Sequence, residues 1–192
     1  MTNHDPNSKV ARVATPTVFV TVGTHEQGFD RLINAVIDLA KRHPNLNIRM
    51  QYGYTDVDLT ALETVDNLSA QQFIPADEMA TLLATSDILI SHGGPATYMP
   101  AVSANKQVIV VPRLSEFNEH VNNHQISFAN QIMQRTAYEI ACVVNIDDLD
   151  QEVAKSISKL TSEQHDPAKS QLPQSNTANF NKEFASILER YI

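Results

Sequence analysis

The sequence is poor in cysteine, in basic residues and in long apolar runs. One cysteine, Cys142, stands among 192 residues, so an internal disulfide is excluded and a reducing compartment is favoured. It lies in the apolar run 140–144, which favours a buried, inert thiol over a reactive one. The 14 lysines and arginines stand against 22 acidic residues, a net charge of −8. This balance argues against a nucleic-acid partner, which requires a basic face.

Long hydrophobic segments are also missing. No run reaches the roughly 18 apolar residues that a membrane-spanning helix needs, and the polar residues 1–16 lack the apolar segment of a signal peptide. We therefore expect a cytoplasmic protein whose residues 1–16 form a flexible leader. If its substrate is a lipid, another molecule must hold that substrate.

Short apolar runs alternate with amphipathic stretches along the rest of the chain. The runs predict strands at residues 17–22, 46–52, 68–74, 87–91, 107–112 and 138–144. Apolar residues at helical spacing predict helices at about 28–43, 75–84, 119–134 and 147–160. Strands and helices that alternate at these lengths predict an α/β fold with a doubly wound, mostly parallel sheet.

One domain accounts for residues 17–160, and the composition changes after it. Residues 161–178 are rich in Ser, Gln, Asn and Pro, which predicts a linker. Residues 179–192 place apolar side chains on one side of a predicted terminal amphipathic helix. That helix either packs on its own domain or contacts a partner subunit, and the pattern leaves both open.

Polar and glycine residues gather in the loops that follow the predicted strands. These loops are residues 23–28, 74–75, 91–95 and 113–120. Four of the seven histidines lie in or beside them: His25, His92, His120 and His124. Because ligands of parallel sheets bind at the carboxyl ends of the strands, we expect the functional site there.

The loop at residues 91–95, Ser-His-Gly-Gly-Pro, has the features of a diphosphate site. Gly93 and Gly94 let the backbone approach a ligand closely, and the helix that follows offers unpaired N–H groups. Pro95 suits the first position of that helix. The alternative is a tight strand-to-helix turn without a ligand.

The loop at residues 23–28 excludes two other classes of nucleotide site. Phe29 and Asp30 stand where a Walker A loop has its lysine and its serine or threonine. The loop also lacks the G-x-G-x-x-G pattern of dinucleotide binding. Nucleoside triphosphate hydrolysis and NAD binding are therefore disfavoured.

His120 and His124 stand four residues apart at the start of a predicted helix, which is also a metal-ligand spacing. No glutamate lies between them in the zinc-protease pattern. Hydrogen bonding to a sugar or nucleotide is the favoured interpretation, with a metal site and a solvated helix start as the alternatives.

Three stretches together resemble the carboxyl-terminal domain of glycosyltransferase family 28. They are residues 18–27, residues 91–96, and residues 109–113 followed by 119–125. Their order and spacing agree with the family over about residues 17–160. The chain is most similar to small bacterial exopolysaccharide and capsule subunits, which are related to the soluble subunit of the eukaryotic transferase that extends a dolichol-linked sugar.

This resemblance implies a Rossmann-like domain that forms the carboxyl-terminal half of a GT-B glycosyltransferase and binds a UDP-sugar. A separate, membrane-anchored subunit would bind a lipid-linked sugar acceptor and hold the chain at the inner face of the plasma membrane. It implies no metal and no cofactor, and the isolated chain could form a homo-oligomer.

We expect the donor to contact residues of all these loops. The expected contacts are Gly23, Thr24, His25, Glu26, His92, Gly93, Gly94, Arg113, Glu119, His120, Asn123 and Gln125. His25 and Glu119 are the candidate catalytic residues, although the base that deprotonates the acceptor is expected on the partner chain. His25 and His92 are expected to donate hydrogen bonds to phosphate oxygens, more strongly when protonated.

The chain departs from the family in one place. Many members have a glycine and a ribose-binding glutamate where this chain has Ala96 and Pro100. Proline cannot make that bond, so Glu119 is the first candidate for the ribose contact.

Two alternatives to a transferase remain: a non-catalytic scaffold subunit, and a metal-independent enzyme such as a nucleotide-sugar epimerase.

Overall fold

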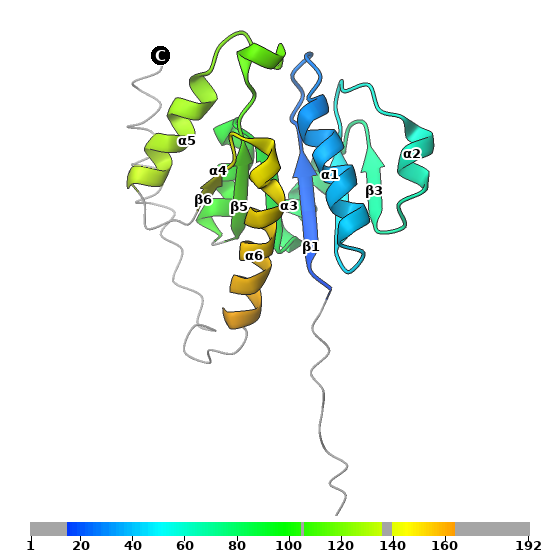
Figure 1. The fold of residues 1–192 in the computed structure, drawn as a ribbon. Coiled ribbons are helices and arrows are strands. Elements are labelled where there is room, and N and C mark those ends of the chain that lie inside the picture. The colour runs from blue at the N-terminus through cyan, green and yellow to red at the C-terminus, as the bar shows by residue number, and fades with distance from the viewer. Residues whose placement is uncertain (1–14, 105, 136–139, 164–192) are drawn as a thin grey trace, which may run out of the picture.

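Six strands form a single parallel sheet. The computed structural model describes residues 15–104, 106–135 and 140–163. The strands are β1 (Thr17–Thr21), β2 (Asn47–Gln51), β3 (Leu68–Gln71), β4 (Ile88–His92), β5 (Gln107–Val111) and β6 (Ile140–Cys142). They lie in the order β3-β2-β1-β4-β5-β6, and every neighbouring pair runs parallel (Figure 1). The predicted α/β fold with a doubly wound sheet is confirmed.

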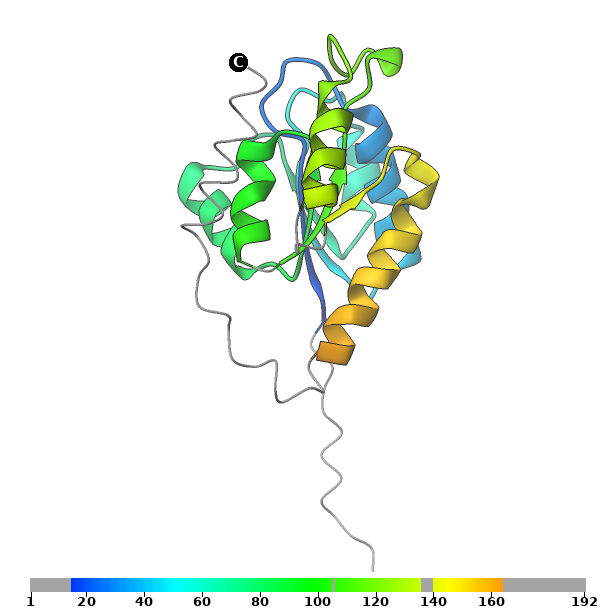
Figure 2. The same ribbon diagram turned by 90° about the vertical axis from the view of Figure 1, so that its left-hand side faces the viewer.

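Helices cover both faces of this sheet. They are α1 (Asp30–Arg42), α2 (Leu59–Glu63), α3 (Ala76–Thr85), α4 (Pro95–Ser103), α5 (His124–Arg135) and α6 (Leu149–Glu163), with two 3-10 turns, η1 (Ser115–Phe117) and η2 (Ile146–Asp148). Helices α1 and α6 pack on one face, and α4 and α5 pack on the other (Figure 2). Two apolar cores, one on each face, thus hold the sheet between them.

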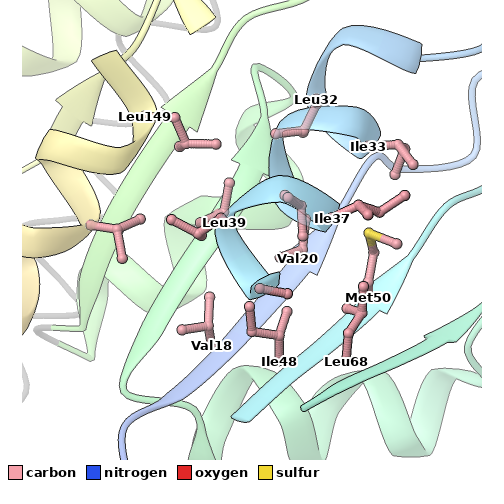
Figure 3. Packing of buried hydrophobic residues seen from close by; sticks show 14 of the residues in the cluster. Val18, Val20, Leu32, Ile33, Ile37, Leu39, Ile48, Met50, Leu68 and Leu149 are labelled. Atoms are coloured by element: carbon pink, nitrogen blue, oxygen red, sulfur yellow. The ribbon is translucent and has the colours of Figure 1, made fainter. Parts of the chain in front are cut away.

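The apolar residues of helix α1 form the face that packs on the sheet. Its apolar residues recur at helical spacing, and those on one side are buried: Leu32, Ile33, Val36, Ile37, Leu39 and Ala40. They contact aliphatic side chains of the central strands, among them Val18, Val20, Ile48 and Met50 (Figure 3). Each large aliphatic side chain buried in this way stabilises the fold by about 1.5–3 kcal/mol.

The strand order reverses between β1 and β4. From β1 the chain continues to β2 and β3 on one side, then crosses back to β4 and continues to β5 and β6 on the other. The connections that follow β1 and β4 therefore leave in opposite directions. In open α/β sheets such a reversal opens a crevice at the carboxyl ends of the two strands, where ligands bind.

Several predicted element boundaries are wrong. The helix expected from residue 119 begins at His124, because residues 115–123 form a loop instead. Asn118 turns this loop with a left-handed φ of 57°, and the Glu119 carboxylate closes it by accepting a 2.9 Å hydrogen bond from the Leu114 amide. Strand β3 ends at Gln71 rather than at residue 74.

The carboxyl-terminal predictions lie mostly outside the described residues. Helix α6 continues to Glu163, so a linker does not begin at residue 161 as predicted. The rest of the predicted linker, the terminal helix at 179–192 and nearly all of the leader at 1–16 fall outside the described ranges. Within those ranges, none of the helices has both the length and the hydrophobicity to cross a bilayer.

Cys142 ends strand β6 and is partly buried. Burial raises the pKa of its thiol to about 11. The thiol therefore stays protonated at neutral pH, and its chemistry is that of an inert side chain, because the thiolate is the reactive form.

Candidate functional site

The imidazole of His92 lies between the two glycine loops at the strand reversal. A Cβ added at Gly23 would come within 2.6 Å of His92 Cε1, and a Cβ added at Gly94 would overlap His92 Nε2. Gly23 also has a left-handed φ of 75°, which disfavours any other residue there. The two glycines therefore bring the loops after β1 and β4 together around one ring.

His92 is uncharged at neutral pH. Burial, with a smaller contribution from the charge of Arg113, lowers its pKa from 6.5 to about 4. Its Nδ1 is buried and has no hydrogen-bond partner in the described part of the chain. The expectation that a protonated His92 binds phosphate is therefore not supported, because a neutral imidazole offers a single N–H donor.

The low pKa of His92 predicts how the stability of the fold depends on pH. Between about pH 6.5 and pH 4 the unfolded chain binds this proton and the folded chain does not, so the unfolding free energy falls as the pH is lowered. The loss that this group causes reaches about 3 kcal/mol at most. Urea titrations at about pH 7 and about pH 4.5 measure it, and His92→Asn should lose much less stability in that interval. Equal losses in both proteins would contradict a neutral, buried His92.

Helix α4 begins directly beside this ring. Gly94 is its N-cap and makes no side-chain cap hydrogen bond, and Pro95 is its first residue. The Thr97 amide donates to the Gly94 carbonyl, whereas the amides of Gly94 and Ala96 have no acceptor among the described residues. Unpaired amides at the positive end of a helix dipole form an anion site.

The Gly93 amide is not free, which corrects its expected role as a phosphate donor. It donates a 3.1 Å hydrogen bond to Gln125 Oε1, and a Cβ at position 93 would come within 2.5 Å of Gln125 Cβ. Gln125 is 5% exposed and was expected to contact the sugar. In this structure it holds the loop after β4 instead.

Three histidines form a row at the same edge of the sheet. The ring centroids of His25 and His120 are 4.8 Å apart, and those of His120 and His124 are 4.7 Å apart. Burial and the nearby charges of His124, His25 and Arg113 lower the pKa of His120. No group of three potential ligands in the described ranges is arranged to hold a metal ion.

Arg113 and Glu119 do not lie where they could touch a ligand, contrary to expectation. They are 1% and 3% exposed. The Glu119 carboxylate receives two hydrogen bonds from Arg31, of 3.0 and 2.9 Å, in addition to that from the Leu114 amide. With its oxygens occupied, Glu119 is poorly placed to bind a ribose or to accept a proton.

The other expected contacts are accessible. Thr24, Glu26 and Asn123 are exposed, and His25 and His120 are partly exposed. The Asn123 side chain accepts a 2.8 Å hydrogen bond from the Ser115 amide and so supports its own loop. Some of the expected contacts are therefore accessible to a ligand, whereas others are buried and hold the loops.

Sequence reasoning missed two of these buried supports. Arg31 reaches from α1 to the carbonyls of Pro112 and Val144 as well as to Glu119. Gln51 donates to the Gly23 carbonyl and accepts from the Ile74 amide, which joins the loops after β1 and β3. The only local signal for Gln51 was a polar residue near the end of a predicted buried strand, and Arg31 gave none.

Several large apolar side chains are exposed on segments that follow the strands. Six of the seven large ones among the described residues follow the carboxyl ends of strands: Tyr54, Leu59, Phe73, Phe117, Val121 and Val144. Val121 is 79% exposed, and the rings of Tyr54 and Phe73 meet edge to face, 5.2 Å apart. We call these six residues the apolar rim.

Comparison with known families decides the classification. The glycosyltransferase family 28 C-terminal domain matches residues 17–191. The chain belongs to this family. The match confirms the predicted membership and extends it beyond residue 160, into the predicted linker and terminal helix. A comparison with curated protein sequences found no match.

Solved structures place this family 28 domain among GT-B glycosyltransferases by fold. MurG of Acinetobacter baumannii is 19% identical, with a TM-score of 0.56 over 89% of this chain and 50% of that one. The calicheamicin glycosyltransferase CalG4 is 16% identical, with a TM-score of 0.56 over 97% and 46%. A UDP-GlcNAc 2-epimerase from Neisseria meningitidis is 14% identical, with a TM-score of 0.51 over 93% and 45%. The chain thus spans about half the length of these proteins.

Proposed function

We propose that this domain binds the UDP-sugar donor of a two-component inverting glycosyltransferase. The observation that carries the proposal is the uncapped start of α4 at the strand reversal, where the amides of Gly94 and Ala96 have no acceptor in the described part of the chain. Family membership supports it. We place the donor diphosphate on these amides and the sugar toward the row of His25, His120 and His124.

The transfer is one displacement. The oxygen of the acceptor hydroxyl attacks the anomeric carbon, the bond from that carbon to the β-phosphate oxygen breaks, and the electron pair stays on the leaving UDP. The N-terminus of α4 and the single N–H of His92 stabilise the charge that develops there, without a metal. The hydroxyl proton goes to a base of the partner chain, or else to His25.

Exposed apolar side chains of this domain support a partner subunit. The apolar rim leaves six large side chains exposed on segments that follow the strands. We propose that the partner covers this rim, anchors the complex at the membrane and holds a lipid-linked acceptor. The family resemblance supports a role in exopolysaccharide or capsule synthesis.

Binding of UDP to the isolated domain tests the proposal. At a UDP concentration of about 100 times Kd, the fold should be stabilised by about 2.7 kcal/mol, which raises Tm by roughly 5–10 °C for a domain of this size. The shift should persist in EDTA, and ADP should give a smaller one. A donor panel on a lipid-linked acceptor, run with and without the membrane-anchored subunit, then tests transfer. Absence of any UDP-dependent shift would favour the scaffold alternative.

A further inference from the structure

Arg113 is an arginine with almost no contact to solvent. Its guanidinium donates to the carbonyls of Val22, Gln27 and Gly28, each at 2.9 Å, and to that of Glu119 at 3.2 Å. The first three carbonyls belong to the loop after β1, and the fourth belongs to the loop after β5. The side chain therefore joins two of the loops that surround the proposed diphosphate position.

A third loop is tied to the same residue through its main chain. Gln125 Oε1 accepts hydrogen bonds from the Arg113 amide, at 2.9 Å, and from the Gly93 amide, at 3.1 Å. Gly93 immediately precedes the uncapped start of α4. The main chain of residue 113 thus helps to hold the loop that precedes α4, whereas the Arg113 side chain holds the loop after β1.

The charge of Arg113 has no carboxylate in contact with it. All four acceptors of its guanidinium are main-chain carbonyls, and its Nε has no acceptor in the described part of the chain. Burial lowers its pKa to about 10, opposed by the charge of Glu119, so the guanidinium remains protonated at neutral pH. The Glu119 carboxylate, whose charge acts on Arg113, is bonded to Arg31 instead.

The buried charge of Arg113 is not offset by an ion pair within the described residues. Arg31 and Glu119 offset each other, and His92 is neutral. The ring of Phe29 lies near both guanidinium groups, with its centroid 5.3 Å from Arg31 Cζ and 4.7 Å from Arg113 Cζ. A charge that is fixed and shielded from water in this way acts more strongly on a nearby anion than a solvated one.

We propose that Arg113 is a positioning residue whose side chain joins the loops after β1 and β5 and whose buried charge favours a diphosphate ligand over an uncharged nucleoside, without touching either. This inference rests on the proposed function, because it assumes that the start of α4 holds the diphosphate. Under this proposal Arg113 does not bind the donor directly, because all of its polar contacts are with the protein itself.

Titrations with UDP and with uridine test it, using ligand-observed NMR for the weaker ligand. Arg113→Met removes the charge and the loop contacts, so both affinities should fall, and the loss for UDP should exceed that for uridine by about tenfold. Arg113→Lys keeps the charge but cannot make the four hydrogen bonds. It should weaken both ligands while keeping their affinity ratio within about threefold of the unaltered protein. Arg42→Met, at the far end of α1, is the matched control and should change neither affinity.

The outcomes separate this inference from the proposed function. If the unaltered protein does not bind UDP, the proposed function fails, and the inference fails with it. If UDP binds but Arg113→Met weakens UDP and uridine equally, Arg113 only supports the fold and the inference is overturned. Circular dichroism reports whether each variant folds. Should the methionine variant not fold, the lysine variant decides, because a changed affinity ratio despite the retained charge would overturn the inference.

Discussion

Gly94→Leu should abolish detectable UDP binding, a loss of at least about 100-fold in affinity. The backbone of Gly94, with φ −77° and ψ 110°, accepts any residue, so the effect comes from the side chain. A Cβ at position 94 would overlap the His92 ring, which Gly23 also borders closely. The leucine must then displace the ring or the start of α4, and its own bulk covers the amides proposed to hold the diphosphate.

The controls separate lost binding from lost folding. Overpacking of this kind costs about 1–3 kcal/mol, so the variant should remain folded, with a lower Tm. Gly94→Ala should give an intermediate loss of affinity, and Ala104→Leu, on the exposed residue that follows α4 at its other end, should change nothing. Calorimetry that finds undiminished UDP affinity in a folded Gly94→Leu protein would place the diphosphate elsewhere.

The sequence was sufficient to predict the sheet and the edge where the site lies. Strands β1, β4 and β5 are apolar runs because both faces of a parallel sheet are buried. The residues that interrupt each apolar run therefore indicate where the strand has its carboxyl end. The same local pattern located Pro95 correctly at the start of α4.

The sequence pattern could not predict which site residues are open to a ligand and which ones support the loops. Gly93 and Gly94 indicated a close backbone approach, yet the groups that approach them in this structure are the side chains of Gln125 and His92. Local spacing does not reveal which group fills the space beside a glycine, because the neighbour comes from packing. Arg113 was expected to contact the donor, but it is buried among carbonyls of a loop some 85–91 residues earlier in the chain.

The ion pair between Arg31 and Glu119 illustrates the same limit and gives the largest expected effect on stability. The two residues are 88 positions apart, and their side chains are 11% and 4% exposed. Glu119→Ala would leave the Arg31 guanidinium and the Leu114 amide without their partner inside the protein. Loss of one member of a buried pair costs about 3–5 kcal/mol, and we expect urea titration at pH 7 to show a decrease of that size.

The surface pair of Lys41 with Asp38 provides the matched control. Its atoms are 3.7 Å apart and its side chains are 53% and 67% exposed, so Asp38→Ala should cost no more than about 1 kcal/mol. A comparable loss in both variants would show that Glu119 does not hold the loop after β5. Glu119→Gln adds the functional test, because its amide keeps the shape of the side chain. If this variant is nearly as stable as the unaltered protein but no longer binds UDP, Glu119 contacts the donor and the structural role argued from its occupied oxygens is wrong.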